Sequence, residues 1–189
     1  MTTLVDRAKG ILLQPGATWK AIDAEFTKPA KIWSGYVVPL AAIGPICMTI
    51  SMILFGQRVA FTSLTNPVSM TTALTSGVAS YVLALLSVFI VSQIVSFLAP
   101  NFGGQKNDVQ ALKAVAYSST ASWVGGVFGL LPQLGLVSLI FSLYTLYLLY
   151  AGLPVVMKVP QDRALGYTAV VIIATIVVFL IMGAVVAAF

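Results

Sequence analysis

The chain is dominated by five long apolar segments that are separated by short polar connections. A helix needs about 20 apolar residues to cross a hydrocarbon core about 30 Å thick. The segments that meet this length cover residues 33–56, 74–99, 111–131, 134–153 and 164–189. The last one is rich in β-branched residues, but a lone strand in lipid would leave its backbone groups unpaired. The pattern therefore predicts five transmembrane helices.

The first 32 residues have the pattern of short amphipathic helices instead of a span. Thr3 and Asp6 have the spacing of a capping box at the start of the first helix. After a Pro-Gly break, a second short helix carries an apolar face formed by Trp19, Ile22 and Phe26. Such helices lie in the headgroup plane, so we expect these three residues to be an interfacial anchor. A docking surface for a cytoplasmic partner has the same pattern.

These two patterns predict an all-α fold with two parts. Residues 1–32 form a cytoplasmic amphipathic segment, and residues 33–189 form a polytopic bundle of five transmembrane helices. The composition agrees, because 59% of the 189 residues are apolar and only 8% are charged, whereas soluble domains carry about 25% charged residues. The net charge of +5 is spread over single Lys and Arg residues, which is not the clustered stripe of a nucleic-acid-binding protein.

The scattered cations predict the orientation of the bundle. With five crossings, nine of the ten Lys and Arg residues fall on the side of the N-terminus. The positive-inside rule then gives a cytoplasmic N-terminus and a C-terminus outside the cytoplasm. The third and fourth spans are separated only by Leu131, Pro132 and Gln133, so both can cross only as a tight helical hairpin. If they formed a re-entrant loop instead, Lys158 and Arg163 would change sides.

Few residues are available for chemistry. The chain has no histidine and one cysteine, and none of its five acids falls inside a predicted span. A metal site of His, Cys and carboxylate ligands therefore cannot be assembled in the membrane, and a proton relay lacks its usual groups. We expect no catalytic residue, no metal and no cofactor, and we interpret the protein as a non-enzyme.

Small residues recur every four positions in the third predicted span, at Ala121, Gly125 and Gly129. This spacing lets helix backbones approach closely, so the stripe is predicted to be a helix-packing face. We expect this face to pack against another span of the same chain and not against a second copy, because the bundle must first pack internally. Oligomerisation remains open.

Polar residues inside the spans define a second group of candidates. Gln93, Tyr117 and Tyr144 are interpreted as an interior polar cluster, and Tyr147 and Tyr150 as a groove that faces lipid. The alternative is that the hydroxyl groups join helices and that Tyr150 belongs to the interfacial aromatic belt.

A polar turn separates the last two spans. The Gly152-Leu153-Pro154 step is predicted to end the fourth helix, because Gly tolerates a left-handed cap and Pro cannot continue the hydrogen-bond ladder. Lys158, Asp162 and Arg163 then form a cytoplasmic turn, whose two cations are expected to contact anionic headgroups.

Three stretches together resemble a known family. They are ILLQPGATWKAI near the N-terminus, DVQALKAVAYSS entering the third span, and YLLYAGLPVVMKVPQDRALGY at the exit of the fourth. Their order and spacing resemble bacterial members of the Yip family, the Ypt/Rab-interacting membrane-protein domain. The resemblance implies five spans, a cytoplasmic N-terminus and an inner-membrane location. Eukaryotic relatives act with Rab GTPases, but the long N-terminal extension and its acidic Tyr-Gly-Pro segment are missing here, so Rab binding is not implied.

Two functional hypotheses follow. In the first, the protein is a non-enzymatic inner-membrane protein that organises lipids or partner proteins through its cytoplasmic face and bundle surface. In the second, it is a small transporter or channel for a polar solute or lipid, with the substrate near Gln93, Tyr117 and Tyr144.

Overall fold

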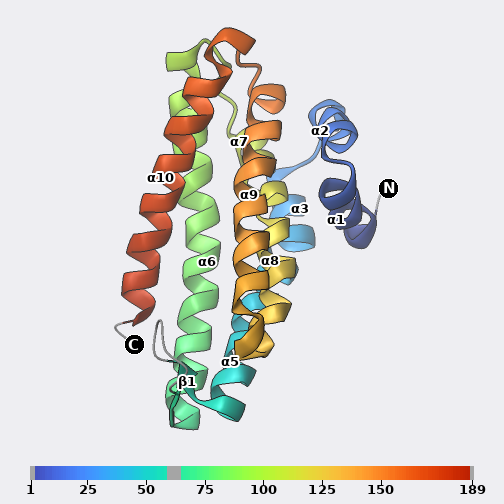
Figure 1. The fold of residues 1–189 in the computed structure, drawn as a ribbon. Helices are drawn as coiled ribbons and strands as arrows, with labels where there is room; N and C mark the ends of the chain where they lie inside the picture. Colours follow the sequence, from blue (N-terminus) through green and yellow to red (C-terminus); the bar gives the residue numbers. More distant parts are fainter. Residues whose placement is uncertain (1–2, 59–64, 188–189) are drawn as a thin grey trace.

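The computed structural model describes residues 3–58 and 65–187. Long helices run side by side along one direction and form a bundle, and two short helices lie against its flank (Figure 1). Among the described residues, the exception to helix and connecting turns is a two-residue antiparallel pair, β1 (Gln57–Arg58) with β2 (Thr65–Asn66). The last two residues of the predicted span 164–189 lie outside the described residues.

The N-terminal segment forms α1 (Leu4–Leu13) and α2 (Pro15–Ala24). The predicted capping box starts α1: the Thr3 hydroxyl accepts from the Asp6 backbone N–H at 3.1 Å, and the Asp6 carboxylate accepts from the Thr3 backbone N–H. Hydrogen bonds from Thr3 hold the pKa of the Asp6 carboxyl below its usual value. Pro at the first position of α2 is compatible with a helix start, because its missing N–H would be unsatisfied there anyway.

Among the described residues, four helical stretches are long and apolar enough to cross a membrane, and they coincide with four of the five predicted spans. They cover Pro29–Phe55, Met70–Phe102, Gly135–Val156 and Gln161–Val185. The second consists of α6 (Met70–Leu98) and the 3-10 turn η2 (Ala99–Phe102), the third is α9 (Gly135–Val156), and the fourth belongs to α10 (Gln161–Ala187).

The first of these stretches changes its helical geometry along its length. It comprises α3 (Pro29–Ile32), a π-helical turn η1 (Trp33–Val37), α4 (Val38–Ala41) and α5 (Ile43–Phe55). Pro39 and Pro45 lack the N–H that a regular α-helix needs, which accounts for the irregular turns next to them.

The expectation of one regular helix over residues 111–131 is wrong. The segment consists of α7 (Asp108–Ser118), α8 (Thr120–Gly125) and the 3-10 helix η3 (Gly126–Leu130), followed by η4 (Pro132–Leu134). The Ser119 hydroxyl donates to the Val115 carbonyl where α7 ends, and such back-bonding bends helices. The Gly125-Gly126 pair further weakens α-helix.

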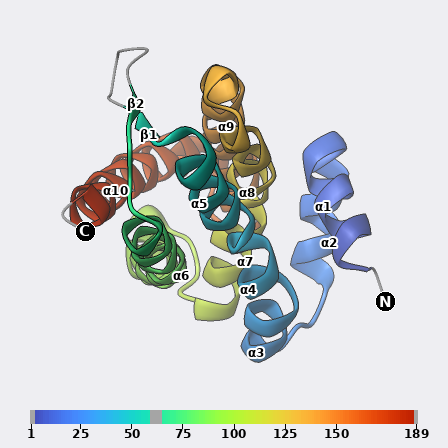
Figure 2. The same ribbon diagram turned by 90° about the horizontal axis from the view of Figure 1, so that it is seen from below.

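This segmented helix lies in the centre of the molecule. Residues 111–121 are all buried, and the view along the bundle shows α7 and α8 surrounded by α4, α5, α6 and α9 (Figure 2). Small residues permit this position: a Cβ atom on Gly126 would lie 2.7 Å from the Gly44 Cα atom. The least apolar of the five predicted spans therefore lies in the centre of the bundle, where the other spans shield it from lipid.

Candidate functional site

The N-terminal arm, residues 3–28, is docked on the bundle. It packs on α7, α8 and α9, on the side away from α6 and α10 (Figure 2). Ile11 and Trp19 are 0% exposed and Ile22 is 1% exposed, whereas Phe26 is 95% exposed. Trp19, Ile22 and Phe26 therefore do not act together as an interfacial anchor. The apolar face of α2 is covered by protein, because the bundle offers a complementary surface.

Gly152 makes this docking possible. A Cβ atom at position 152 would lie 2.4 Å from Trp19 Cε2 and 2.5 Å from Trp19 Cζ2. The absence of a side chain thus lets the indole ring lie directly against α9. The prediction that Gly152-Leu153-Pro154 ends the helix is wrong, since α9 continues to Val156 with Pro154 inside it. The glycine serves packing and not termination.

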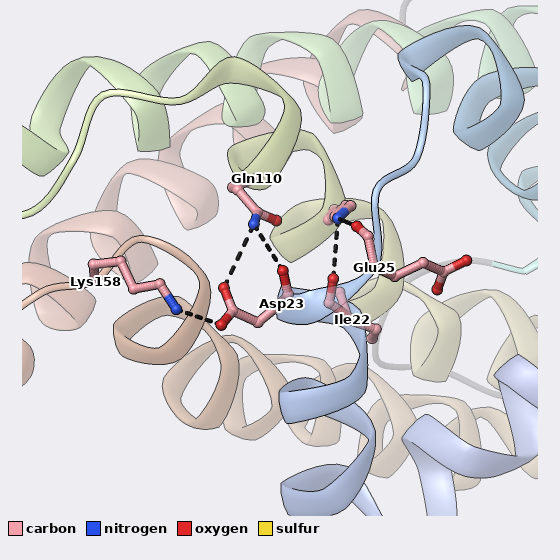
Figure 3. Close-up of polar contacts among 6 residues, drawn as sticks. Ile22, Asp23, Glu25, Gln110 and Lys158 are labelled. Carbon is pink, nitrogen blue, oxygen red and sulfur yellow. Dashed lines mark hydrogen bonds and ion pairs between the residues drawn. The ribbon is translucent and has the colours of Figure 1, made fainter.

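The bundle also satisfies the carbonyl groups at the ends of the arm helices. Lys113 of α7 is 2% exposed, and its Nζ atom donates to the Ile22 carbonyl at 3.0 Å and to the Glu25 carbonyl (Figure 3). The Tyr144 hydroxyl of α9 donates to the Leu12 carbonyl at 2.8 Å. Helix C-termini leave carbonyls without partners and favour a cation, so Lys113 suits the end of α2.

Asp23 ties the same end of the arm to two further elements. Its carboxylate pairs with Lys158, beyond α9, and its carbonyl accepts from Gln110 Nε2 at 3.2 Å (Figure 3). Within the arm, Arg7 of α1 pairs with Glu25. The C-terminal end of α2 is therefore held by residues from α7 and from the α9–α10 turn.

The turn after α9 is a left-handed helix cap. Lys158 has a φ of +56°, and the Val159 N–H donates to the Pro154 carbonyl at 3.2 Å, which is the long bond of a Schellman motif. Asp162 and Arg163 are exposed, and the Arg163 Nε atom lies 3.8 Å from the Asp162 Oδ2 atom. Of the predicted turn residues, Lys158 faces the arm, and Asp162 and Arg163 face outward.

The predicted interior polar cluster does not exist. Gln93 is exposed on the outer side of α6, whereas the Tyr117 ring packs edge-on against Tyr36 with centroids 4.7 Å apart, and Tyr144 bonds Leu12. A cavity between α6, α7, α9 and α10 has a volume of only about 10 Å³. Since a helix that is apolar all round gives no sign of which face turns inward, the sequence could not assign Gln93 to a side.

The lipid-facing groove predicted at Tyr147 and Tyr150 stays a prediction. Both tyrosines stand half exposed on α9, with Tyr147 stacked on Tyr144 at 5.5 Å between ring centroids. A separate apolar groove of about 520 Å³ runs between α5 and α6, with Gly77 in its wall.

The predicted packing stripe splits between two environments. Ala121 is fully buried, and a Cβ atom on Gly125 would lie 2.3 Å from the Phe141 Cβ atom of α9. A Cβ atom on Gly129 would meet no atom within 4 Å. The close approach therefore involves α8 and α9 of the same chain and ends before Gly129.

Comparison with known families bears on this arrangement. The family described as Yip1 domain matches residues 9–182, which is most of the chain. The chain belongs to the Yip1-domain family. This membership confirms the resemblance to the Yip family and, together with the long apolar helices, indicates a membrane protein. Comparisons with curated proteins and with solved structures gave no match.

In this Yip1-domain protein, the site residues that sequence reasoning missed are Lys113, Gln110 and the Trp19–Gly152 contact. A signal for Lys113 was present, because a lysine in an apolar segment is costly unless it has partners. Across residues 3–58 and 65–187, no group of three or more His, Cys, Asp or Glu side chains could hold a metal ion.

Proposed function

We propose that the chain crosses a bacterial inner membrane five times with its N-terminus in the cytoplasm. The path of the chain supports a fifth crossing: α6 ends at the same end of the bundle where α7 begins, and α9 begins at the opposite end (Figure 1). The segment between them must therefore run the length of the bundle. Lys106, Lys113, Lys158 and Arg163 all belong to the end that this orientation assigns to the cytoplasm.

The protein, in this proposal, is a non-enzymatic organiser of membrane lipids or partner proteins that works through the N-terminal arm. The observation that carries it is the fixation of the arm by buried Lys113. Ordering a segment in this way restricts its conformations and preorganises whatever it presents for binding. The fixed arm presents Phe26, which is 95% exposed, beside the exposed Lys28. An apolar ring next to cations suits an anionic membrane surface or an acidic partner.

Site-specific crosslinking tests this role. A photo-crosslinking amino acid at position 26 should give a discrete lipid or protein adduct in cells. Lys113→Met, which leaves the Ile22 and Glu25 carbonyls without their donor, should reduce that adduct several-fold. Lys31→Met removes an exposed cation as a control and should leave it unchanged. Equal adducts in the Lys113→Met protein would rule out a role for the docked arm.

The rival function is a small transporter or channel. Exposed Gln93 lies on the outside of α6, away from Tyr117 and Tyr144, which supports a closed bundle. A substrate that crosses needs several polar contacts to replace its hydration. Reconstituted liposomes should show no protein-dependent flux of ions or small polar solutes. Reproducible flux that Gln93→Leu abolishes would favour the transporter instead.

A further inference from the structure

A second groove, of about 410 Å³, lies where α6 meets the loop that leads to α7. Its walls include Gln93, Ile94, Phe97, Ser96, Lys106 and Asp108. Phe97 is 71% exposed, so the groove opens to the outside of the bundle and not to its interior. On α6 the wall combines apolar Ile94 and Phe97 with polar Gln93 and Ser96, and the charged groups come from Lys106 in the loop and Asp108 at the start of α7. Apolar and charged groups thus meet in one groove, which suits the glycerol and headgroup region of a lipid.

The groove lies at the level where the bilayer changes from hydrocarbon to headgroups. α6 has 29 residues and is about 44 Å long, which exceeds the roughly 30 Å of the hydrocarbon core. Thr71 and Thr72 occupy its first turn. Twenty residues counted from Leu74 end at Gln93, so Gln93 stands at the cytoplasmic boundary. Lys106 and Asp108 then lie among the headgroups.

The polar groups of this groove still have bonding capacity. Within the described residues, Lys106 forms no ion pair, and no side-chain hydrogen bond of Gln93 is found. The Asp108 carboxylate accepts one hydrogen bond, from the buried Ser96 hydroxyl at 2.5 Å. A carboxylate has room for several further donors. The groove thus offers one ammonium group, one carboxylate and one amide beside an apolar wall.

We propose that this groove binds one phospholipid of the cytoplasmic leaflet with a phosphoethanolamine headgroup. Lys106 pairs with the phosphate, Asp108 accepts from the primary ammonium group, and Gln93 bonds an ester carbonyl. Ile94 and Phe97, which follow Gln93 on the cytoplasmic side, flank the glycerol and ester region, and the acyl chains continue past Gln93 toward the bilayer centre. A phosphoglycerol headgroup has no ammonium group for Asp108 and adds no favourable charge. A choline headgroup has no N–H to donate. The inference rests on the proposed function, in which the protein organises lipids, and names the lipid.

Lipid binding to the full chain in detergent tests the assignment. Native mass spectrometry should detect one tightly held lipid when phosphatidylethanolamine is added, and about tenfold weaker retention of phosphatidylcholine or phosphatidylglycerol. Lys106→Gln should weaken phosphatidylethanolamine binding about tenfold, by loss of one charge-assisted bond. Asp108→Asn should abolish the preference over phosphatidylglycerol. Asparagine can still accept from Ser96, and Asn107 still caps α7, so the fold is kept.

Lys31→Gln is the matched control, because it removes an exposed lysine outside the groove. It should leave retention unchanged. Equal retention of the three lipids, or insensitivity to both groove variants, would overturn the proposal and reduce the groove to ordinary lipid contact. So would occupation of the groove by a second copy that excludes lipid. None of these results would affect crosslinking at Phe26, which depends on Lys113, so the two proposals fail separately.

Discussion

Two single residues decide how the N-terminal arm sits on the bundle. Lys113 supplies a buried cation to the carbonyl groups at the end of α2, and Gly152 supplies space for the ring of Trp19. The first interaction is electrostatic and directional, and the second is purely steric. Both are made across long sequence separations, 91 residues in the case of Lys113 and the Ile22 carbonyl.

Replacing Gly152 with Ala should destabilise the protein. The new methyl group would overlap the Trp19 ring, and overpacking of this kind costs about 1–3 kcal/mol. Thermal unfolding in detergent, followed by circular dichroism, measures the change. Gly183→Ala is the control, because Gly183 lies in α10 with nothing within 4 Å of its Cβ position. It should be neutral or gain up to about 1 kcal/mol of helix propensity. A Gly152→Ala protein as stable as the parent would contradict the contact.

At the scale of elements, α7 and α8 form the centre around which the apolar helices assemble. Lipid exerts no hydrophobic force between helices, so close packing and hydrogen bonds must hold them. Small residues provide the close packing, as at Gly125 against Phe141. Hydroxyl groups provide the hydrogen bonds. The hydroxyl oxygens of Tyr36 and Thr120 lie 2.7 Å apart, and the Tyr167 hydroxyl donates to the Val95 carbonyl at 2.8 Å.

Gly125→Leu should therefore separate α8 from α9 locally. The expected loss is about 1–3 kcal/mol of stability, because the Phe141 Cβ atom occupies the space that the leucine needs. Gly129→Leu makes the same chemical change four positions later, where nothing lies within 4 Å, and should change the melting temperature much less. If the two variants had the same melting temperature, the α8–α9 contact would not limit stability.

For the whole molecule, the distribution of charge and the course of the chain both support the proposed five-span topology. The turn that contains Gln133, between η3 and α9, lies at the end opposite the α9–α10 turn (Figure 1). Lys106 belongs to the α6–α7 connection, and Lys158 and Arg163 belong to the α9–α10 turn. Both Gln133 and Gln161 are exposed, so cysteines at these positions can report their side of the membrane.

In a Cys47→Ser background, Gln133→Cys should react in intact cells with an impermeant thiol reagent, and Gln161→Cys should react only after the cells are opened. This outcome requires that the segmented helix crosses the membrane. Labelling of position 161 from outside would invert the orientation, and protection of position 133 would remove the fifth crossing.

Sequence alone predicted four of the spans, the capped first helix and the family, because these depend on local properties. Span length follows from counting apolar residues, and Thr3 and Asp6 are close in the chain. The sequence did not predict the contacts between residues that are far apart in the chain. α6 and α9 are apolar nearly all round, so no periodicity indicated that Gln93 faces outward or that Gly152 meets Trp19. Only tertiary packing fixes helix rotation, and with it the docked arm and the groove at Lys106.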